Sequence, residues 1–211
     1  MPAQSLETLV QPGRAVLVAI EVQNGVVGPE SALPALAEAG AEVGMIGNVA
    51  RLARAARAAG VQVIHATAES LPHGFGASRN ARLFGGARRA GASNSPGSSS
   101  VQPVAELEVD PDDLILPRYH GLSPLTGSPL DSLLRNSGIT TIVIVGVSLN
   151  VAVTNMVFDA VNRAYQVVVV TDAVAGTPVA YGAQVLEHTI SFLATLTTTD
   201  ELVATWASLA K

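Results

Sequence analysis

The chain has 211 residues, of which 48% are hydrophobic and 14% charged, and its formal net charge is −5. This composition excludes a disordered chain, and it disfavours nucleic-acid binding because an acidic protein offers no face that neutralises phosphates. The chain has no cysteine and its single lysine is Lys211, which excludes disulfides, a thiolate nucleophile and an internal catalytic lysine.

No segment resembles a signal peptide or a membrane span. Met1–Gly13 is polar and contains two prolines, and the longest apolar runs fall far short of the roughly 20 residues that cross a bilayer. We therefore expect a cytoplasmic protein with no membrane contact. The length favours a single domain over residues 1–211.

Apolar runs rich in β-branched residues predict the strands, and these are, in chain order, Ala15–Ile20, Val61–Ile64, Leu114–Leu116, Thr141–Val147, Gln166–Thr171 and Ala194–Thr198. The strongest are continuous rather than alternating, which is typical of parallel strands buried on both faces. Helical patterns lie between them, at Val43–Ala59, Pro129–Asn136, Val151–Ala164, Val179–Leu193 and from Thr199 onward. This alternation predicts an α/β fold, a three-layer α/β/α arrangement around a doubly wound, mostly parallel six-stranded sheet of Rossmann-like topology.

The segment Ser70–Ser100 differs from the rest of the chain. It is rich in Gly, Ser and Asn and contains four arginines but no acidic residue: Arg79, Arg82, Arg88 and Arg89. We interpret it as a flexible insertion within the domain. It is either a solvated loop or a lid that draws an anionic substrate toward an acidic protein.

Ligands of doubly wound sheets bind at the carboxyl ends of the strands. The segments expected at that edge are Glu21–Asn24, His65–Glu69, Pro117–Ser123, Ser148–Asn150 and Asp172–Gly176. The turn Gln23–Gly28 lacks the glycine pattern of a dinucleotide-binding loop, so we expect no nucleotide cofactor. Glu69 and His73 are too weak a pair to predict a metal site.

Several segments carry a resemblance to a known family. They are Val18–Asn24 (VAIEVQN), Gly127–Leu130 (GSPL), Val145–Thr154 (VGVSLNVAVT), Asp159-Ala160 and Val169–Ala173 (VVTDA). With the strand spacing, residues 14 to 205 or so resemble the isochorismatase-like hydrolases, also called the cysteine hydrolase superfamily. The resemblance implies a small-molecule substrate and a homo-oligomer.

Amidases of that family use an Asp, a Lys and a Cys. The resemblance places Glu21 at the Asp and Ala152 at the Cys, and it places the Lys within Pro117–His120, where no lysine occurs. Because alanine has no lone pair, an acyl-enzyme at this position is impossible. Isochorismatases proper, which have Gly in place of Cys, hydrolyse a vinyl ether by acid chemistry from the first-strand carboxylate. The resemblance therefore implies that Glu21 is a general acid, if burial raises its pKa.

Each residue also has a structural interpretation. Glu21 is either catalytic or ion-paired with an arginine such as Arg118. Gln23 and Asn24 either bind the ligand or shape the loop after the first strand. His120 or Arg118, with Tyr119 between them, would take the place of the lysine, although His120 is equally interpretable as an ordinary loop histidine. His65 either lines the cleft or is a histidine at the edge of the core.

The segment after the fourth strand offers main-chain donors. Ser148 and Asn150 are residue types that cap helices, and the amides near Val151, Ala152 and Val153 would bind a carboxylate or an oxyanion. The resemblance implies a cis peptide near Val147-Ser148.

Two function hypotheses follow. The first is a hydrolase that acts on a small, anionic metabolite by cysteine-independent acid/base chemistry. The second is a catalytically silent member that binds a small molecule or serves as a scaffold. A deep cleft with an unpaired Glu21 favours the first, and an internal salt bridge at Glu21 favours the second.

Overall fold

The computed structural model describes residues 4–89 and 94–210. At its centre lies a six-stranded sheet in the order β3-β2-β1-β4-β5-β6, and every neighbouring pair is parallel. The strands are β1 (Ala15–Ile20), β2 (Gln62–Ala68), β3 (Leu114–Arg118), β4 (Thr141–Val147), β5 (Gln166–Ala175) and β6 (Thr195–Thr197). The predicted α/β class and doubly wound sheet are confirmed.

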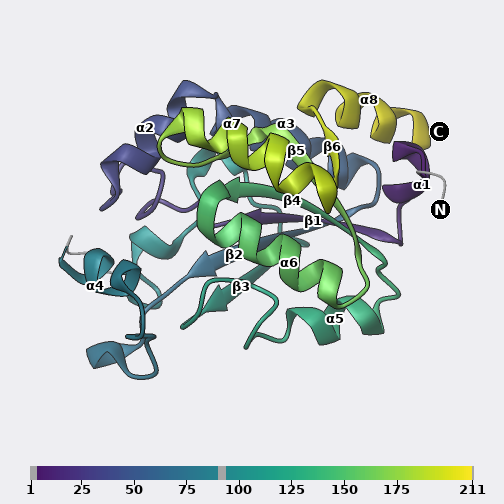
Figure 1. The fold of residues 1–211 in the computed structure, drawn as a ribbon. Coiled ribbons are helices and arrows are strands. Elements are labelled where there is room, and N and C mark those ends of the chain that lie inside the picture. Colours follow the sequence, from purple (N-terminus) through teal and green to yellow (C-terminus); the bar gives the residue numbers. More distant parts are fainter. Residues whose placement is uncertain (1–3, 90–93, 211) are drawn as a thin grey trace.

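Helices cover both faces of the sheet (Figure 1). One apolar core lies under α1 (Leu6–Leu9), α2 (Pro34–Glu42), α3 (Met45–Ala58) and α8 (Thr199–Leu209). The other lies under α5 (Leu130–Asn136), α6 (Thr154–Asn162) and α7 (Val179–His188). Because side chains alternate along a strand, Leu17 of β1 enters the first core and Val18 enters the second. This double covering explains why β1 and β4 are almost entirely apolar, with Thr141 as the one polar residue in these two strands.

In the described parts of the chain, the α-helices α1, α2 and α4 (Arg82–Arg89) occur where none was expected. The sequence pattern of Val43–Ala59 does form α3, but Gly44 adopts a left-handed conformation with φ of 65° and separates α3 from the preceding α2. Within Ser70–Ser100, the interpretation as a loop is wrong for α4 (Arg82–Arg89), which lies apart from the sheet at the lower left of Figure 1. Residues 90–93 and the side chains of Arg88 and Arg89 lie outside the described part of that segment.

The last helix begins as the sequence predicts. Thr198 caps α8 by accepting a hydrogen bond from the Glu201 amide, and the Glu201 side chain accepts one from the Thr198 amide in return. Trp206 on this helix is fully buried and donates to the carbonyl of Val10 at 3.1 Å, which holds α8 beside the N-terminal segment. Among the described residues, none of the helices is long and apolar enough to cross a bilayer.

Candidate functional site

A buried ion pair lies at the carboxyl edge of the sheet. Glu21 directly follows β1, and its amide donates to the carbonyl of Ala66 in β2 at 2.8 Å. Arg118 is the last residue of β3, on the far side of β2, and its Nη2 donates to Oε1 of Glu21. The two side chains are only 17% and 10% exposed. The interpretation of Glu21 as the partner of Arg118 is therefore confirmed.

The environment of Glu21 changes its proton affinity. Burial raises the pKa of Glu21, because a charged carboxylate is poorly solvated there, while the charge and hydrogen bond of Arg118 lower it. Burial is the larger cause, so the pKa of Glu21 is raised overall. A carboxyl group in this state holds its proton closer to neutral pH than an exposed glutamate does.

Arg118 is held by the loop that follows it. Its Nη1 donates to the carbonyl of His120 at 3.2 Å and to that of Gly121, whose own amide donates to Ser78 Oγ at 3.0 Å. His120 is exposed, and its ring lies against Gly127, where a Cβ would come within 2.1 Å of the imidazole. Arg118 rather than the His120 ring thus contacts the carboxylate. For the half-buried Tyr119 side chain, the described residues supply no hydrogen bond.

The side chains of Gln23 and Asn24 bind the protein's own backbone. Gln23 is fully buried, and its amide group accepts from the Ala68 amide at 2.7 Å and donates to the carbonyls of Ala68 and Ser100 at 3.1 and 3.2 Å. Asn24 donates to the carbonyl of Ser99 at 3.1 Å. These bonds tie the end of the Ser70–Ser100 segment to the edge that carries Glu21, which agrees with the interpretation of both residues as shaping the loop.

The turn after β4 lies beside Glu21, because Ile20 pairs with Gly146 in the adjacent strands β1 and β4. Gly146 has a φ of 102°, and a Cβ there would lie 2.2 Å from the carbonyl oxygen of Ile20. Only glycine fits where these two strands approach so closely. The Val147-Ser148 peptide is cis, as the resemblance implies.

The next five residues, Leu149–Val153, form a π-helical turn that leads into α6. The amides of Val151 and Val153 both donate to the carbonyl of Ser148, at 3.0 and 3.1 Å. These two amides, which were expected to bind an anion in the cleft, are therefore already used by the carbonyl of Ser148. Ala152 is only 4% exposed and packs within the second apolar core.

Neither expected capping residue acts as a side-chain cap. Ser148 occupies the N-cap position but makes no side-chain cap hydrogen bond. Asn150 lies inside the turn and donates to the carbonyl of Thr177 at 3.4 Å, while its buried Oδ1 has no partner among the described residues. A cavity of about 150 Å³ lies beside this turn, with Leu149 and Gly176 in its wall, but neither Glu21 nor Arg118 lines it.

Glu69, a further acid at the carboxyl edge, follows β2 and accepts from the Thr67 hydroxyl at 3.2 Å. His73 lies in a short exposed turn, Pro72–Gly74. Within residues 4–89 and 94–210, no three histidine or acidic side chains gather as metal ligands would.

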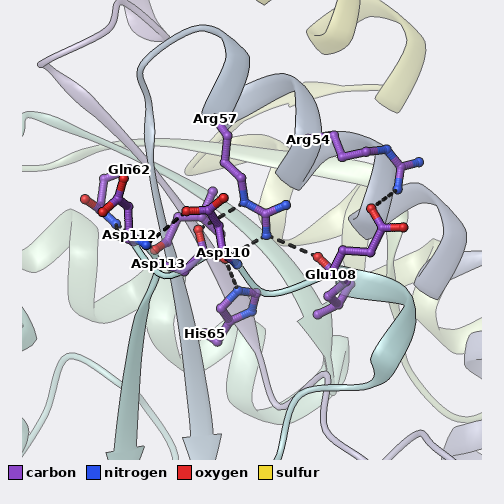
Figure 2. Close-up of polar contacts among 10 residues, drawn as sticks. Arg54, Arg57, Gln62, His65, Glu108, Asp110, Asp112 and Asp113 are labelled. Atoms are coloured by element: carbon purple, nitrogen blue, oxygen red, sulfur yellow. Dashed lines mark hydrogen bonds and ion pairs between the residues drawn. The ribbon is translucent and has the colours of Figure 1, made fainter.

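His65 belongs to a buried polar cluster, shown in Figure 2. It is 2% exposed on β2, and its Nε2 lies 2.8 Å from Oδ2 of Asp113, the residue before β3. Arg57 of α3 donates to both oxygens of the same carboxylate, at 3.1 and 2.6 Å. The interpretation of His65 as a core histidine is confirmed. Arg57 and Asp113 were not predicted as partners, and the only signal for them in the sequence is an acid directly before a strand.

This cluster predicts a fall in stability in mild acid. Burial lowers the pKa of His65, against the opposing effect of Asp113, so the folded protein binds a proton there less readily than the unfolded chain. As pH falls below about 6.5, the unfolded state takes up the proton first, and the free energy of unfolding falls by at most about 1.4 kcal/mol per pH unit from this group. Urea denaturation between pH 7 and 5 measures the slope.

The variant His65→Gln should flatten that slope, whereas His188→Gln should leave it unchanged because His188 is exposed. An unchanged slope in His65→Gln would contradict the assignment of this pH dependence to His65.

Comparisons with known proteins agree with this geometry. A model of the isochorismatase domain matches residues 15–201. The ureidoacrylate amidohydrolase RutB of Methylorubrum extorquens is 40% identical over 79 residues, which are 36% of this chain and only 31% of that protein. A cysteine hydrolase from Pseudomonas syringae pv. phaseolicola 1448A superposes with a TM-score of 0.83 at 23% identity, over 99% of this chain and 100% of that one. An isochorismatase family protein from Burkholderia thailandensis gives 0.71 at 28% identity, over 92% and 96%.

Proposed function

The chain belongs to the isochorismatase-like hydrolase family, and on that premise we propose that it hydrolyses a small anionic metabolite with Glu21 as the general acid. The observation that carries the proposal is the buried Glu21 carboxyl at the carboxyl edge of the sheet, whose pKa is raised by burial although it lies against Arg118. Hydrolysis through an acyl-enzyme, which a cysteine hydrolase performs, is not proposed because the chain has no cysteine.

Cleavage of a vinyl ether suits these residues. Protonated Glu21 gives its proton to the terminal carbon of the double bond, and the ether carbon becomes an oxocarbenium ion. Water adds to that carbon, and the resulting hemiketal releases the alcohol and leaves a ketone. Glu21 then regains a proton from solvent, so no covalent bond to the protein forms at any step. The Arg118 guanidinium orients the carboxyl group and stabilises its anionic state after proton transfer.

An anionic substrate is supported by the charges around this pair. Arg118 lies within Pro117–His120, where the resemblance places the family's lysine. The hydrogen bond from the Gly121 amide to Ser78 joins the Ser70–Ser100 segment to the loop after Arg118. Arg79 directly follows Ser78 and is exposed, so its guanidinium is available to an anion from solvent. Exposed cations attract such a substrate most strongly at low ionic strength.

A substrate panel tests the proposal. We expect the wild-type protein to hydrolyse isochorismate or a simpler carboxylate-bearing vinyl ether, with lower efficiency at higher salt, and to leave amides such as ureidoacrylate intact. Product formation is measured by chromatography, and hydrolysis in ¹⁸O-labelled water should leave the released alcohol unlabelled, because water adds to the carbon that becomes the ketone. Amide hydrolysis without vinyl-ether hydrolysis would contradict the proposal.

A second candidate function rests on the same contact. Arg118 is held by two carbonyls as well as by Glu21, so the ion pair is internally satisfied. An internal salt bridge at Glu21 favours a member that binds a small molecule without turnover. Saturable calorimetric binding of isochorismate, with no product after prolonged incubation, would favour this function over hydrolysis.

A further inference from the structure

A second cavity lies at the opposite edge of the sheet from Glu21. Its volume is about 480 Å³, and its wall comes from the amino-terminal starts of β1, β2 and β3 together with α5 and the turn after it. This volume is within the range of roughly 300–1,000 Å³ that is usual for small-molecule sites. The observations about this cavity are independent of the function proposed for Glu21.

The wall of the cavity is apolar and its rim is polar. Val16, Ile64, Leu114 and Leu134 supply aliphatic surface from three strands and a helix. The polar members of the lining include Gln62, Asp112 and Ser137, and no arginine, lysine or histidine belongs to it. Arg14 lies between the lining residues Gly13 and Ala15 in the chain, but it does not itself line the cavity.

The two neighbouring aspartates at this rim differ in their pairing, as Figure 2 shows. Asp113 points toward Arg57 and His65, which satisfy its carboxylate. Asp112 lies beside Gln62 instead, it is exposed, and in the described parts of the chain no cationic side chain pairs with it. The rim thus keeps one uncompensated negative charge.

Gln62 adds an acceptor to the same rim. Its Nε2 is used by the carbonyls of Asp112, at 2.8 Å, and of its neighbour Val63, at 3.0 Å. Only its side-chain oxygen is left for a ligand. An ammonium group, which has several donors and no acceptor, matches a carboxylate and an amide oxygen at the mouth of an aliphatic cavity.

We propose that this cavity binds a small amphipathic cation, with an apolar body among Val16, Ile64 and Leu134 and a protonated amine against Asp112 and Gln62. The apolar wall accounts for the apolar body of the ligand, and the unpaired Asp112 carboxylate accounts for the positive charge of its amine. The site lies on the edge of the sheet that the proposed hydrolase chemistry does not use.

Three probes with one skeleton test the proposal in the wild-type protein: 4-phenylbutylammonium, 4-phenylbutanol and 4-phenylbutanoate. We expect the ammonium to bind about tenfold more tightly than the alcohol, since a charge-assisted hydrogen bond is gained, and the carboxylate to bind most weakly. Calorimetry gives the affinities. Amide NMR shifts should be confined to the surroundings of Gly60, Gln62 and Ser137.

Two variants distinguish the binding of the ammonium group from the binding of the apolar body of the probes. Asp112→Asn should reduce the affinity for the ammonium to that for the alcohol, whereas Glu38→Gln, which changes an exposed acid on α2, should change nothing. Ser137→Trp, at an exposed rim position, should block all three probes without disturbing the core. Equal affinities for the three probes, an unaffected Asp112→Asn variant, or shifts centred on Glu21 would each overturn the proposal.

Discussion

Replacing Glu21 with glutamine is expected to slow vinyl-ether hydrolysis by about 100- to 10,000-fold, which is the usual contribution of a general acid. Glutamine keeps the shape of the side chain and can still contact Arg118, but it has no proton to give to carbon. The expected loss is therefore in kcat, with little change in KM. Steady-state kinetics on the substrate identified from the panel gives both constants.

The pH dependence of the wild type should carry the same signature. A general acid works only when protonated, so kcat should fall as pH rises through the raised pKa of Glu21. Glu69→Gln is the matched control, because the Glu69 carboxylate lies at the same edge but accepts from the Thr67 hydroxyl, and only the Glu69 backbone amide contacts Arg118. If Glu21→Gln retains wild-type kcat, the acid is another group.

Replacing Asp113 with asparagine is expected to destabilise the fold by about 3 kcal/mol. The Asp113 side chain is 2% exposed and binds both Arg57 and His65, so the variant leaves a mostly buried guanidinium without its counter-charge. The sole tryptophan, Trp206, is fully buried and reports urea denaturation by its fluorescence.

The matched control is Asp200→Asn. Asp200 also pairs with an arginine of α3, Arg51, but its side chain is 81% exposed. Solvent and salt screen such a surface pair, so the loss should stay below about 1 kcal/mol. Equal losses of unfolding free energy in the two variants would show that burial does not make the Asp113 contacts more stabilising than the surface pair.

Much of the fold was predictable because both faces of the sheet are covered. β1 and β4 have the bounds that their continuous runs predict, since both faces of these strands are buried and Thr141 is the one polar residue in them. The Glu21–Arg118 contact could be predicted from the sequence for a related reason. Parallel strands end at one edge, so the polar residues that follow them are brought together even when they are 97 positions apart in the sequence.

The features that the sequence did not predict depend on which of several similar hydrogen-bond partners each group contacts. Leu149–Val153 has the composition of an ordinary first helical turn, and the π-helical form depends only on which carbonyl each amide reaches. The Arg57–Asp113 contact joins residues 56 positions apart, and the arginines of α3 look alike in sequence although one is largely buried and two are about half exposed.

The π-helical turn also limits what a cysteine at position 152 could do. Ala152→Cys alone would place a sulfur among core side chains, beside amides that are already committed to the carbonyl of Ser148. The Val153 bond to Ser148 spans five residues, one more than an α-helical bond, and the Val151 bond to the same carbonyl spans three. A sulfur at position 152 would therefore meet neither a free Val151 amide nor a free Val153 amide, so a cysteine side chain alone does not supply the main-chain donors that an oxyanion needs.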